Sequence, residues 1–278
     1  MKDKPNLFLV GAPKSGSTLL WSILKKHKDV FTTKELKEIN HFSYDELTYN
    51  SYYKDYKIRN ENDYLKAFKK GKSFKYLVDG SVSYFAYPSI PKKLHEFNSK
   101  AKIIIIVRDP ILRAFSHYNM DKRMGYATES LNEYLVNKKN KHKKFIHQYI
   151  ENSLYYKQVS NYLEYFDENQ IFIAQLENIN DDIDKLCSFL ELDNLEYSKD
   201  QERVNANKTP RNIISKTLQH NRNLTSKLKI IIPQQLVDYL KFLFYKTAEK
   251  KQLKEVDRLL LEQYINKDYF KFKNIYLK

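Results

Sequence analysis

The chain has 278 residues, and its 42% hydrophobic content is enough for a buried core, which excludes a disordered protein. The single cysteine, Cys187, excludes an internal disulfide and a cysteine metal cluster. The formal net charge of +15 indicates an anionic partner such as a phosphorylated cofactor, an acidic glycan, nucleic acid or a membrane surface, and does not choose among them. The apolar runs at 7–10 and 103–107 are too short for a signal peptide or a membrane span, so we expect a soluble, cytoplasmic protein.

Short apolar runs bounded by polar residues predict four strands. They lie at 7–10, 76–78, 103–107 and 171–174. Helical periodicity separates them, at 18–24, 63–70, 90–98, 111–122, 154–166 and 181–190. Strands that alternate with helices pair in parallel and are covered on both faces. The expected fold is therefore a three-layer α/β/α arrangement around a central, mostly parallel sheet, of the kind that binds nucleotides through a P-loop.

The chain contains no internal repeat and no Gly/Ser linker, so we expect a single domain over residues 1–278. Residues 213–278 are predicted to form helices that cover the sheet or close the acceptor cleft. Their expected apolar stripes consist of Leu236, Leu240 and Leu243, and then of Val256, Leu259, Leu260 and Tyr264.

The segment 11–18 joins the first strand to the first helix and carries two of the five glycines, Gly11 and Gly16. A loop that enters a helix presents backbone N–H groups and the positive end of the helix dipole, which together bind phosphate. Nucleoside triphosphatases place a lysine directly after the second glycine, followed by a hydroxyl that binds magnesium. Here Ser17 stands at that lysine position, and the cation comes earlier, at Lys14. The altered loop suits a donor without β- and γ-phosphates, which needs no magnesium clamp.

Residues 7–24 resemble the 5′-phosphosulfate loop of sulfotransferases, which has the form G-x-x-K-[SG]-G-[ST]-[ST]. The second hallmark of that family is an arginine at the end of a strand and a serine eight positions later, matched here by Arg108 and Ser116. The resemblance implies transfer of a sulfuryl group from 3′-phosphoadenosine-5′-phosphosulfate (PAPS), with release of adenosine 3′,5′-bisphosphate (PAP) and with no metal required.

The same resemblance implies which residues hold the donor. The 5′-phosphosulfate would lie on Lys14, Ser15, Gly16, Ser17 and Thr18, with Lys14 also stabilising the oxygen that leaves with PAP. The 3′-phosphate would be bound by Arg108 and Ser116, and by a late basic loop at 205–211 through Arg211 and Lys208. Asp109 and Pro110 also fit the capped start of the helix that follows Arg108.

The segment 37–42 resembles the K-E-x-x-F-F segment of bacterial and heparan-type sulfotransferases, in which the glutamate is the proposed base. Glu38 is therefore the candidate catalytic base, and His41 is an alternative base, an acceptor contact or a packing residue. One departure concerns the segment 79–85, where heparan-type relatives carry Glu-Lys-Thr-Pro. Gly80 replaces the lysine, which weakens any transfer of heparan specificity.

We therefore expect an enzyme that sulfates a hydroxyl or amine of a glycan or of a small molecule, without a nucleic-acid partner. Two other functions stay open at this stage. One is a P-loop kinase that uses ATP and magnesium, and the other is a non-enzymatic protein that binds nucleic acid or another polyanion. The sequence does not specify the acceptor or the oligomeric state.

Overall fold

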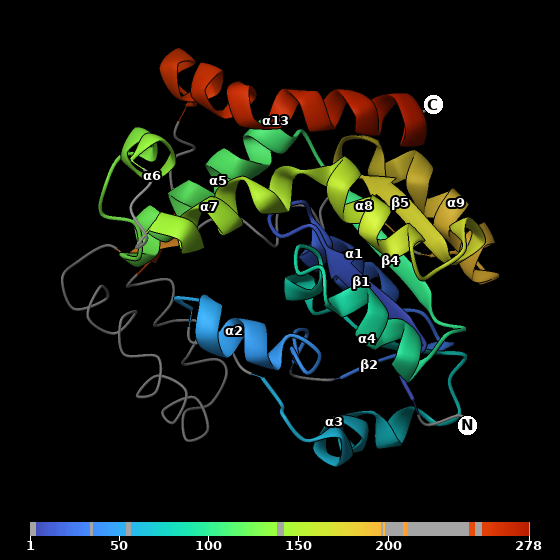
Figure 1. Cartoon of the computed structure of the whole chain (residues 1–278). Coiled ribbons are helices and arrows are strands. Elements are labelled where there is room, and N and C mark those ends of the chain that lie inside the picture. The colour runs from blue at the N-terminus through green and yellow to red at the C-terminus, as the bar shows by residue number, and fades with distance from the viewer. Residues whose placement is uncertain are drawn as a thin grey trace.

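The computed structural model describes residues 4–33, 36–53, 57–137, 142–195, 197, 208–210, 245–247 and 252–277. Its centre is a five-stranded sheet in the order β2-β3-β1-β4-β5, and all four strand pairs are parallel (Figure 1). The strands are β1 Leu7–Gly11, β2 Val30–Thr32, β3 Tyr76–Asp79, β4 Lys102–Val107 and β5 Ile171–Gln175. The four predicted strands are confirmed, and β2 was missed because three residues give too short a pattern.

The described part of the chain forms ten α-helices around this sheet. They are α1 Ser17–Leu24, α2 Tyr44–Asn50, α3 Glu61–Phe68, α4 Ile90–Phe97, α5 Pro110–Met124, α6 Leu131–Val136, α7 Lys143–Tyr149, α8 Tyr155–Leu163, α9 Ile179–Leu190 and α13 Glu255–Tyr276. Short 3-10 turns that matter below are η2 Val82–Tyr84, η4 Glu151–Ser153 and η6 Leu176–Asn178.

Side chains of the central strands divide between two hydrophobic cores because successive residues of a strand point to opposite faces. In β4, Ile103 and Ile105 pack with α3, α4 and α8, whereas Ile104 and Ile106 pack with α1 and α9. Every one of these isoleucines is fully buried. The apolar run of β4 is continuous because this strand is buried on both faces, as inferred from the sequence. This confirms the three-layer α/β/α fold.

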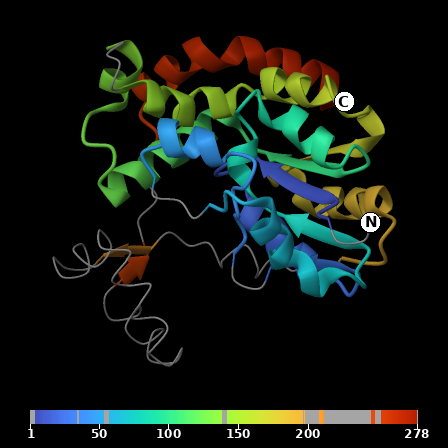
Figure 2. The ribbon, with the colours of Figure 1, turned by 60° about the horizontal axis from the view of Figure 1, so that its bottom comes forward.

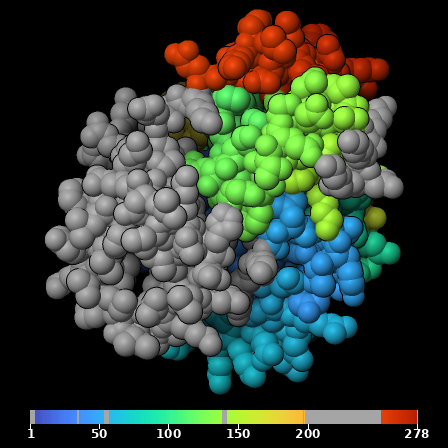
Figure 3. Space-filling view, turned by 90° about the vertical axis from the view of Figure 1, so that its left-hand side faces the viewer, coloured from blue at the N-terminus to red at the C-terminus, as the bar shows by residue number. Residues whose placement is uncertain are grey.

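Helix α13 lies along the outside of α5 and α8, and Figures 1 and 2 show this from two directions. In Figure 3 its red surface borders the green surface of the middle of the chain. The Asp268 carboxylate accepts hydrogen bonds from the N–H groups of Tyr156 and Lys157, both at 2.9 Å, and so caps the first turn of α8. No described helix is both long and apolar enough to cross a membrane.

The buried stripe of α13 differs from the predicted one. Leu261, Ile265 and Phe272 are completely buried, whereas Val256 and Leu259 are exposed. Leu260 is buried as predicted, and Tyr264 is exposed at 39%. Spacing alone could not choose the face, because apolar residues occur on several sides of this helix.

Two short strands, β6 Lys208–Pro210 and β7 Tyr245–Thr247, form an antiparallel pair. The helical prediction for 213–278 is therefore wrong at 245–247. Leu236, Leu240 and Leu243 lie outside the described residues. The single domain and the covering role of 213–278 stay predictions.

Replacing Phe272 with alanine should lower the free energy of unfolding by about 3–5 kcal/mol, because a buried ring is lost and a cavity remains. Phe270→Ala is the matched control in the same helix, since Phe270 is 68% exposed, and it should cost less than about 0.5 kcal/mol. Urea unfolding of both variants measures the difference. Equal effects would contradict the docking of α13.

Candidate active site

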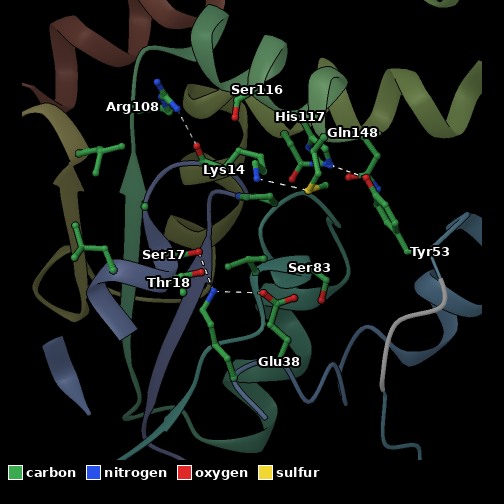
Figure 4. Close-up of a pocket in the computed structure, with 18 of the residues that line it drawn as sticks. Lys14, Ser17, Thr18, Glu38, Tyr53, Ser83, Arg108, Ser116, His117 and Gln148 are labelled. Carbon is green, nitrogen blue, oxygen red and sulfur yellow. Dashed lines mark hydrogen bonds and ion pairs between the residues drawn. The ribbon is translucent and has the colours of Figure 1, made fainter. Parts of the chain in front are cut away.

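A cavity of about 930 Å³ opens at the carboxyl ends of β1 and β4 (Figure 4). β1 lies between β3 and β4: the chain runs from β1 to β2 and β3 on one side and then crosses to β4 on the other, and parallel sheets bind ligands at such a reversal of strand order. The cavity is lined by Pro13, Lys14, Gly16, Ser17, Thr18, Leu19, Lys37, Glu38, Leu47, Tyr53, Val82, Ser83, Tyr87, Arg108, Ser116, His117, Met120, Met124, His147, Gln148, Asn152, Leu176 and Glu177.

The loop 11–18 wraps one end of this cavity. Gly16 caps α1 with a φ of 95°, and a side chain there would come within 2.6 Å of Leu176. Lys14 also has a left-handed backbone, with a φ of 69°, which costs a non-glycine residue about 1–3 kcal/mol. The surrounding structure must stabilise this conformation. Two guanidinium groups do so by donating to the loop carbonyls, the half-buried Arg108 to Lys14 at 3.4 Å and the buried Arg113 to Pro13 at 3.5 Å.

The Lys14 ammonium faces the cavity. Its Nζ contacts Met120 Sδ at 3.5 Å, and no carboxylate of the described residues pairs with it. Burial, followed by the nearby charge of Arg123, lowers the pKa of Lys14 from 10.5 to about 8. A half-buried cation that faces a cavity and lacks a carboxylate partner is suited to an anionic ligand.

Arg108 and Ser116 line the same cavity as the loop 11–18, at the carboxyl edge of the sheet. Arg108 follows β4, which pairs directly with β1, and its Nε is buried without a hydrogen-bond partner in the described part of the chain. Asp109 caps α5 by accepting from the N–H of Leu112 at 2.7 Å, and Pro110 is the first helical residue, as the sequence predicts. Figure 4 shows Ser116 on the first turns of α5, on the same side as Arg108.

The structure brings together most of the residues predicted for the donor. Lys14, Gly16, Ser17, Thr18, Arg108 and Ser116 line one cavity. Ser15 is fully buried and does not line it. The backbone of Lys208 lies in β6, and Arg211 is outside the described residues.

Glu38 also lines this cavity, and Lys37 connects it to the loop. The ammonium of Lys37 donates to Ser17 Oγ at 2.9 Å and to Glu38 Oε1 at 3.3 Å. Burial lowers the pKa of Lys37, whereas the adjacent Glu38 carboxylate raises it. Ser17 stands where triphosphatases carry a lysine, but Lys37, from another segment, places its ammonium beside Ser17. Sequence reasoning missed this role, and the only available signal was that Lys37 directly precedes Glu38.

The segment 37–42 is anchored on the turn that follows β3. Ser81 Oγ accepts from the N–H groups of Ile39 at 3.0 Å and Asn40 at 2.9 Å, and it donates to the buried Asp79 carboxylate at 2.5 Å. Gly80 donates its N–H to the Lys37 carbonyl at 3.2 Å, and a Cβ at position 80 would lie 2.7 Å from the Trp21 ring and 3.0 Å from Lys37 Cγ. The absence of a side chain at 80 therefore leaves space for Trp21 and Lys37.

His41 does not join this site. Its ring stacks on Tyr64 with centroids 4.5 Å apart, and its Nδ1 bonds the Ile58 carbonyl at 2.9 Å. It lines a separate depression near Phe97. Asn40, between Glu38 and His41, has a φ of 55° and turns the chain there. This placement does not support a role for His41 as a base or as an acceptor contact at the cavity, and it favours the packing alternative.

Arg113 is a buried residue whose hydrogen bonds join several elements, and the sequence analysis gave it no role. Its guanidinium donates to Ser153 Oγ at 2.8 Å and to the carbonyls of Gln148 and Tyr149 at 2.6 and 2.8 Å. Burial lowers its pKa only to about 10, so the charge persists at neutral pH. Through these bonds α5 is joined to α7, η4 and the loop.

The same guanidinium determines the hydrogen bonding of His117. Arg113 Nη1 lies 3.2 Å from His117 Nδ1, and because arginine can only donate, Nδ1 must accept. Nε2 then carries the proton and donates to Tyr53 Oη at 2.9 Å, and Tyr53 donates to Asp121. Burial holds the pKa of His117 well below its ordinary value. His117 is neutral and both of its nitrogens are bonded, so it is not available as a base.

The sequence profile of the family described as "Sulfotransferase domain" matches residues 4–233. Heparan sulfate glucosamine 3-O-sulfotransferase 5 of Homo sapiens is 25% identical over 189 residues, which is 63% of this chain and 48% of the relative. Membrane-associated sulfotransferase kil1 of Dictyostelium discoideum is 31% identical over 119 residues, which is 41% of this chain and 22% of the relative. The chain thus spans about half the length or less of these curated relatives.

Among solved structures, the sulfotransferase from Alicyclobacillus acidocaldarius superposes with a TM-score of 0.58 at 25% identity. The match covers 80% of this chain and 96% of that one. It agrees with the α/β/α architecture.

Ser81→Ala should lower the free energy of unfolding by about 1–3 kcal/mol, because two backbone N–H groups and Asp79 each lose a buried partner. Ser188→Ala removes only an exposed bond to the Asp184 carbonyl and should cost less than about 0.5 kcal/mol. Thermal or urea unfolding compares the two. A loss for Ser81→Ala no larger than the control would show that this turn does not anchor 37–42.

Proposed function

The chain belongs to the sulfotransferase domain family, and on that premise we propose that it transfers a sulfuryl group from PAPS to an acceptor hydroxyl or amine, releasing PAP. Three segments that line one cavity support this proposal. They are the loop 11–18, the Arg108–Ser116 pair and the Lys37–Glu38 pair.

The observation that carries the proposal is the adjacency of two anion sites on neighbouring parallel strands. The loop after β1 offers backbone N–H groups and the Lys14 ammonium to a 5′-phosphosulfate. Arg108, at the end of β4, has a buried Nε without a partner among the described residues and would bind the 3′-phosphate with Ser116. A donor with phosphates at both ends of its ribose fits this pair.

In the proposed step, the acceptor oxygen or nitrogen attacks sulfur and forms the new bond. The bond between sulfur and the bridging oxygen breaks, and its electron pair stays with the 5′-phosphate of PAP. Lys14 stabilises the negative charge that develops on that oxygen. Glu38 takes the acceptor proton, and Lys37 holds the Glu38 carboxylate beside Ser17.

For the acceptor we propose a glycan or a small molecule. Relatives named for heparan sulfate support a glycan, although they match only part of their length here. That the reaction needs no metal, and that the protein is cytoplasmic, stay predictions.

Isothermal calorimetry with PAP and turnover of sulfur-labelled PAPS test the proposal together. We expect PAP to bind the wild-type protein, and Arg108→Ala to weaken that binding while the protein stays folded. Wild-type protein that does not bind PAP would overturn the proposal. Unchanged PAP affinity in Arg108→Ala would overturn the 3′-phosphate role.

PAP affinity should fall as the pH rises through about 8, the pKa of Lys14 in the folded protein. An anion binds the protonated ammonium, which is mostly present below that pH, and at pH 9 about a tenth remains, so affinity should drop about tenfold from pH 7. The phosphates of PAP are already ionised over this range. Calorimetry at pH 7, 8 and 9 measures the change.

Lys14→Arg is the control for this pH series, because an arginine stays charged. Its PAP affinity should be nearly constant from pH 7 to 9. If this variant shows the same decline as the wild type, another group such as Lys37 titrates instead.

Glu38→Gln should leave PAP affinity within about twofold and lower kcat by about 10²–10⁴-fold, since the amide cannot accept the acceptor proton. Glu96→Gln, a carboxylate change on the separate depression near His41, is the matched control and should keep wild-type kcat. Turnover of labelled PAPS at saturating donor gives both values. Retained turnover in Glu38→Gln would show that another group takes the proton from the acceptor.

A further inference from the structure

Asp121 is a completely buried carboxylate on α5, and the transfer step described above does not use it. Three tyrosine hydroxyls donate hydrogen bonds to it. They belong to Tyr52 and Tyr53, which follow α2, and to Tyr149 of α7, whose bond is 2.8 Å long. Side chains from three separate parts of the chain thus converge on one carboxylate.

The three hydroxyls determine the charge of Asp121. Burial raises the pKa of each tyrosine, so all three keep their protons at neutral pH. Tyr53 accepts from His117 Nε2 at 2.9 Å, which leaves its own proton for Asp121. Burial by itself raises the pKa of Asp121, and the three hydrogen bonds oppose this effect because they favour the ionised form. Asp121 is therefore a buried negative charge.

This negative charge lies near Lys14 without touching it. The Lys14 Nζ contacts Sδ of Met120, the residue before Asp121, at 3.5 Å (Figure 4). The hydrogen-bond partners of the Asp121 carboxylate among the described residues are hydroxyls and not cations. The two charges nevertheless attract each other, since Asp121 raises the pKa of Lys14 and Lys14 lowers that of Asp121.

The other influences on Lys14 all disfavour its charged form. Burial is the largest of them, and the positive charges of Arg123, Arg108 and Arg113 add to it. In the described part of the chain, Asp121 is the one carboxylate among the charged groups that act on Lys14.

The remaining titratable groups of the cavity lining are paired or neutral. Lys37 pairs with Glu38 at 3.3 Å, and Glu177 accepts from a backbone N–H at 3.1 Å. His117 bonds through both ring nitrogens, and burial lowers the pKa of His147 to about 4, so it is neutral at physiological pH.

We propose that Asp121 is a positioning residue for the sulfuryl transfer, which supplies the counter-charge that keeps Lys14 protonated while leaving the ammonium free to bind the donor. This inference rests on the proposed function, because it concerns the cation assigned to the donor. A carboxylate bonded directly to Lys14 would compete with the anionic ligand for the donors of the ammonium. Here the tyrosine hydroxyls bond the carboxylate instead, and its charge acts on Lys14 from a distance.

The protonation of Lys14 can be measured directly in the ligand-free protein. The ¹³Cε resonances of lysine-labelled protein are followed from about pH 6 to pH 11, and Lys14 is assigned by its loss in Lys14→Arg. In Asp121→Asn the Lys14 midpoint should shift to lower pH, because the nearby negative charge is lost and the three arginines remain. An unchanged or higher midpoint would overturn the inference.

Tyr149→Phe is the matched control, because it removes a hydrogen bond to Asp121 and keeps the charge of the carboxylate. Its Lys14 midpoint should stay at the wild-type value. A downward shift as large as that of Asp121→Asn would show that packing, and not charge, controls Lys14, and would overturn the inference.

The wild-type protein offers a test that does not require a folded variant. In protein labelled with ¹³C-aspartate, the Asp121 ¹³Cγ resonance, assigned through the backbone, should have the chemical shift of a carboxylate at pH 7. A protonated Asp121 carboxyl at this pH would overturn the inference.

PAP binding connects the charge of Asp121 to the donor site. Wild-type PAP affinity should be about twofold higher at pH 7 than at pH 8, and Asp121→Asn should increase this ratio about threefold if the Lys14 midpoint falls by about one pH unit. The ratio is compared because the loss of Asp121 also removes a charge that repels PAP. An unchanged ratio would overturn the inference. Absence of PAP binding to the wild type would overturn the proposed function, whereas the ligand-free titration of Lys14 tests the inference by itself, so the two failures are distinguishable.

Discussion

Parallel pairing of β1 with both β3 and β4 is the constraint on which the site depends. Parallel strands end at the same edge of a sheet, so the segments that follow them must emerge side by side. The loop after β1, the Ser81 turn after β3 and Arg108 after β4 are therefore neighbours, although they are separated by tens of residues. Burial of the strands on both faces fixes this register, since a one-residue shift would exchange the two cores.

Hydrogen bonds of buried polar groups then fix the positions of the side chains at this edge of the sheet. Arg113 uses its donors to join the loop, α5 and α7, and Ser81 uses one hydroxyl to hold two backbone N–H groups of 37–42. Each of these groups would be costly if it were left without a partner. The left-handed backbone of Lys14 persists in this surrounding, and it places the ammonium at the cavity.

Charged and uncharged side chains line the same cavity. The donor site combines Lys14, Arg108 and the start of α1, and a bound anion would complete it. The cavity is also lined by two tyrosines, two methionines and two neutral histidines. The net charge of +15 does not predict the acceptor, because among the described lysines and arginines only Lys14, Lys37 and Arg108 line the cavity.

The sequence alone determined the strand–loop–helix unit around Lys14 and the Arg108 strand end, because both lie in short contiguous segments whose patterns reflect local physics. It also indicated Glu38, through resemblance. Only the tertiary structure decided that Lys37 reaches Ser17, that Gly80 packs against Trp21 and Lys37, and that His41 lies in a separate depression. These contacts join residues that are distant in the chain, and periodicity within one element carries no information about them. The choice of Phe272 over Phe270 as the buried ring follows the same rule, since a neighbouring helix selects the face.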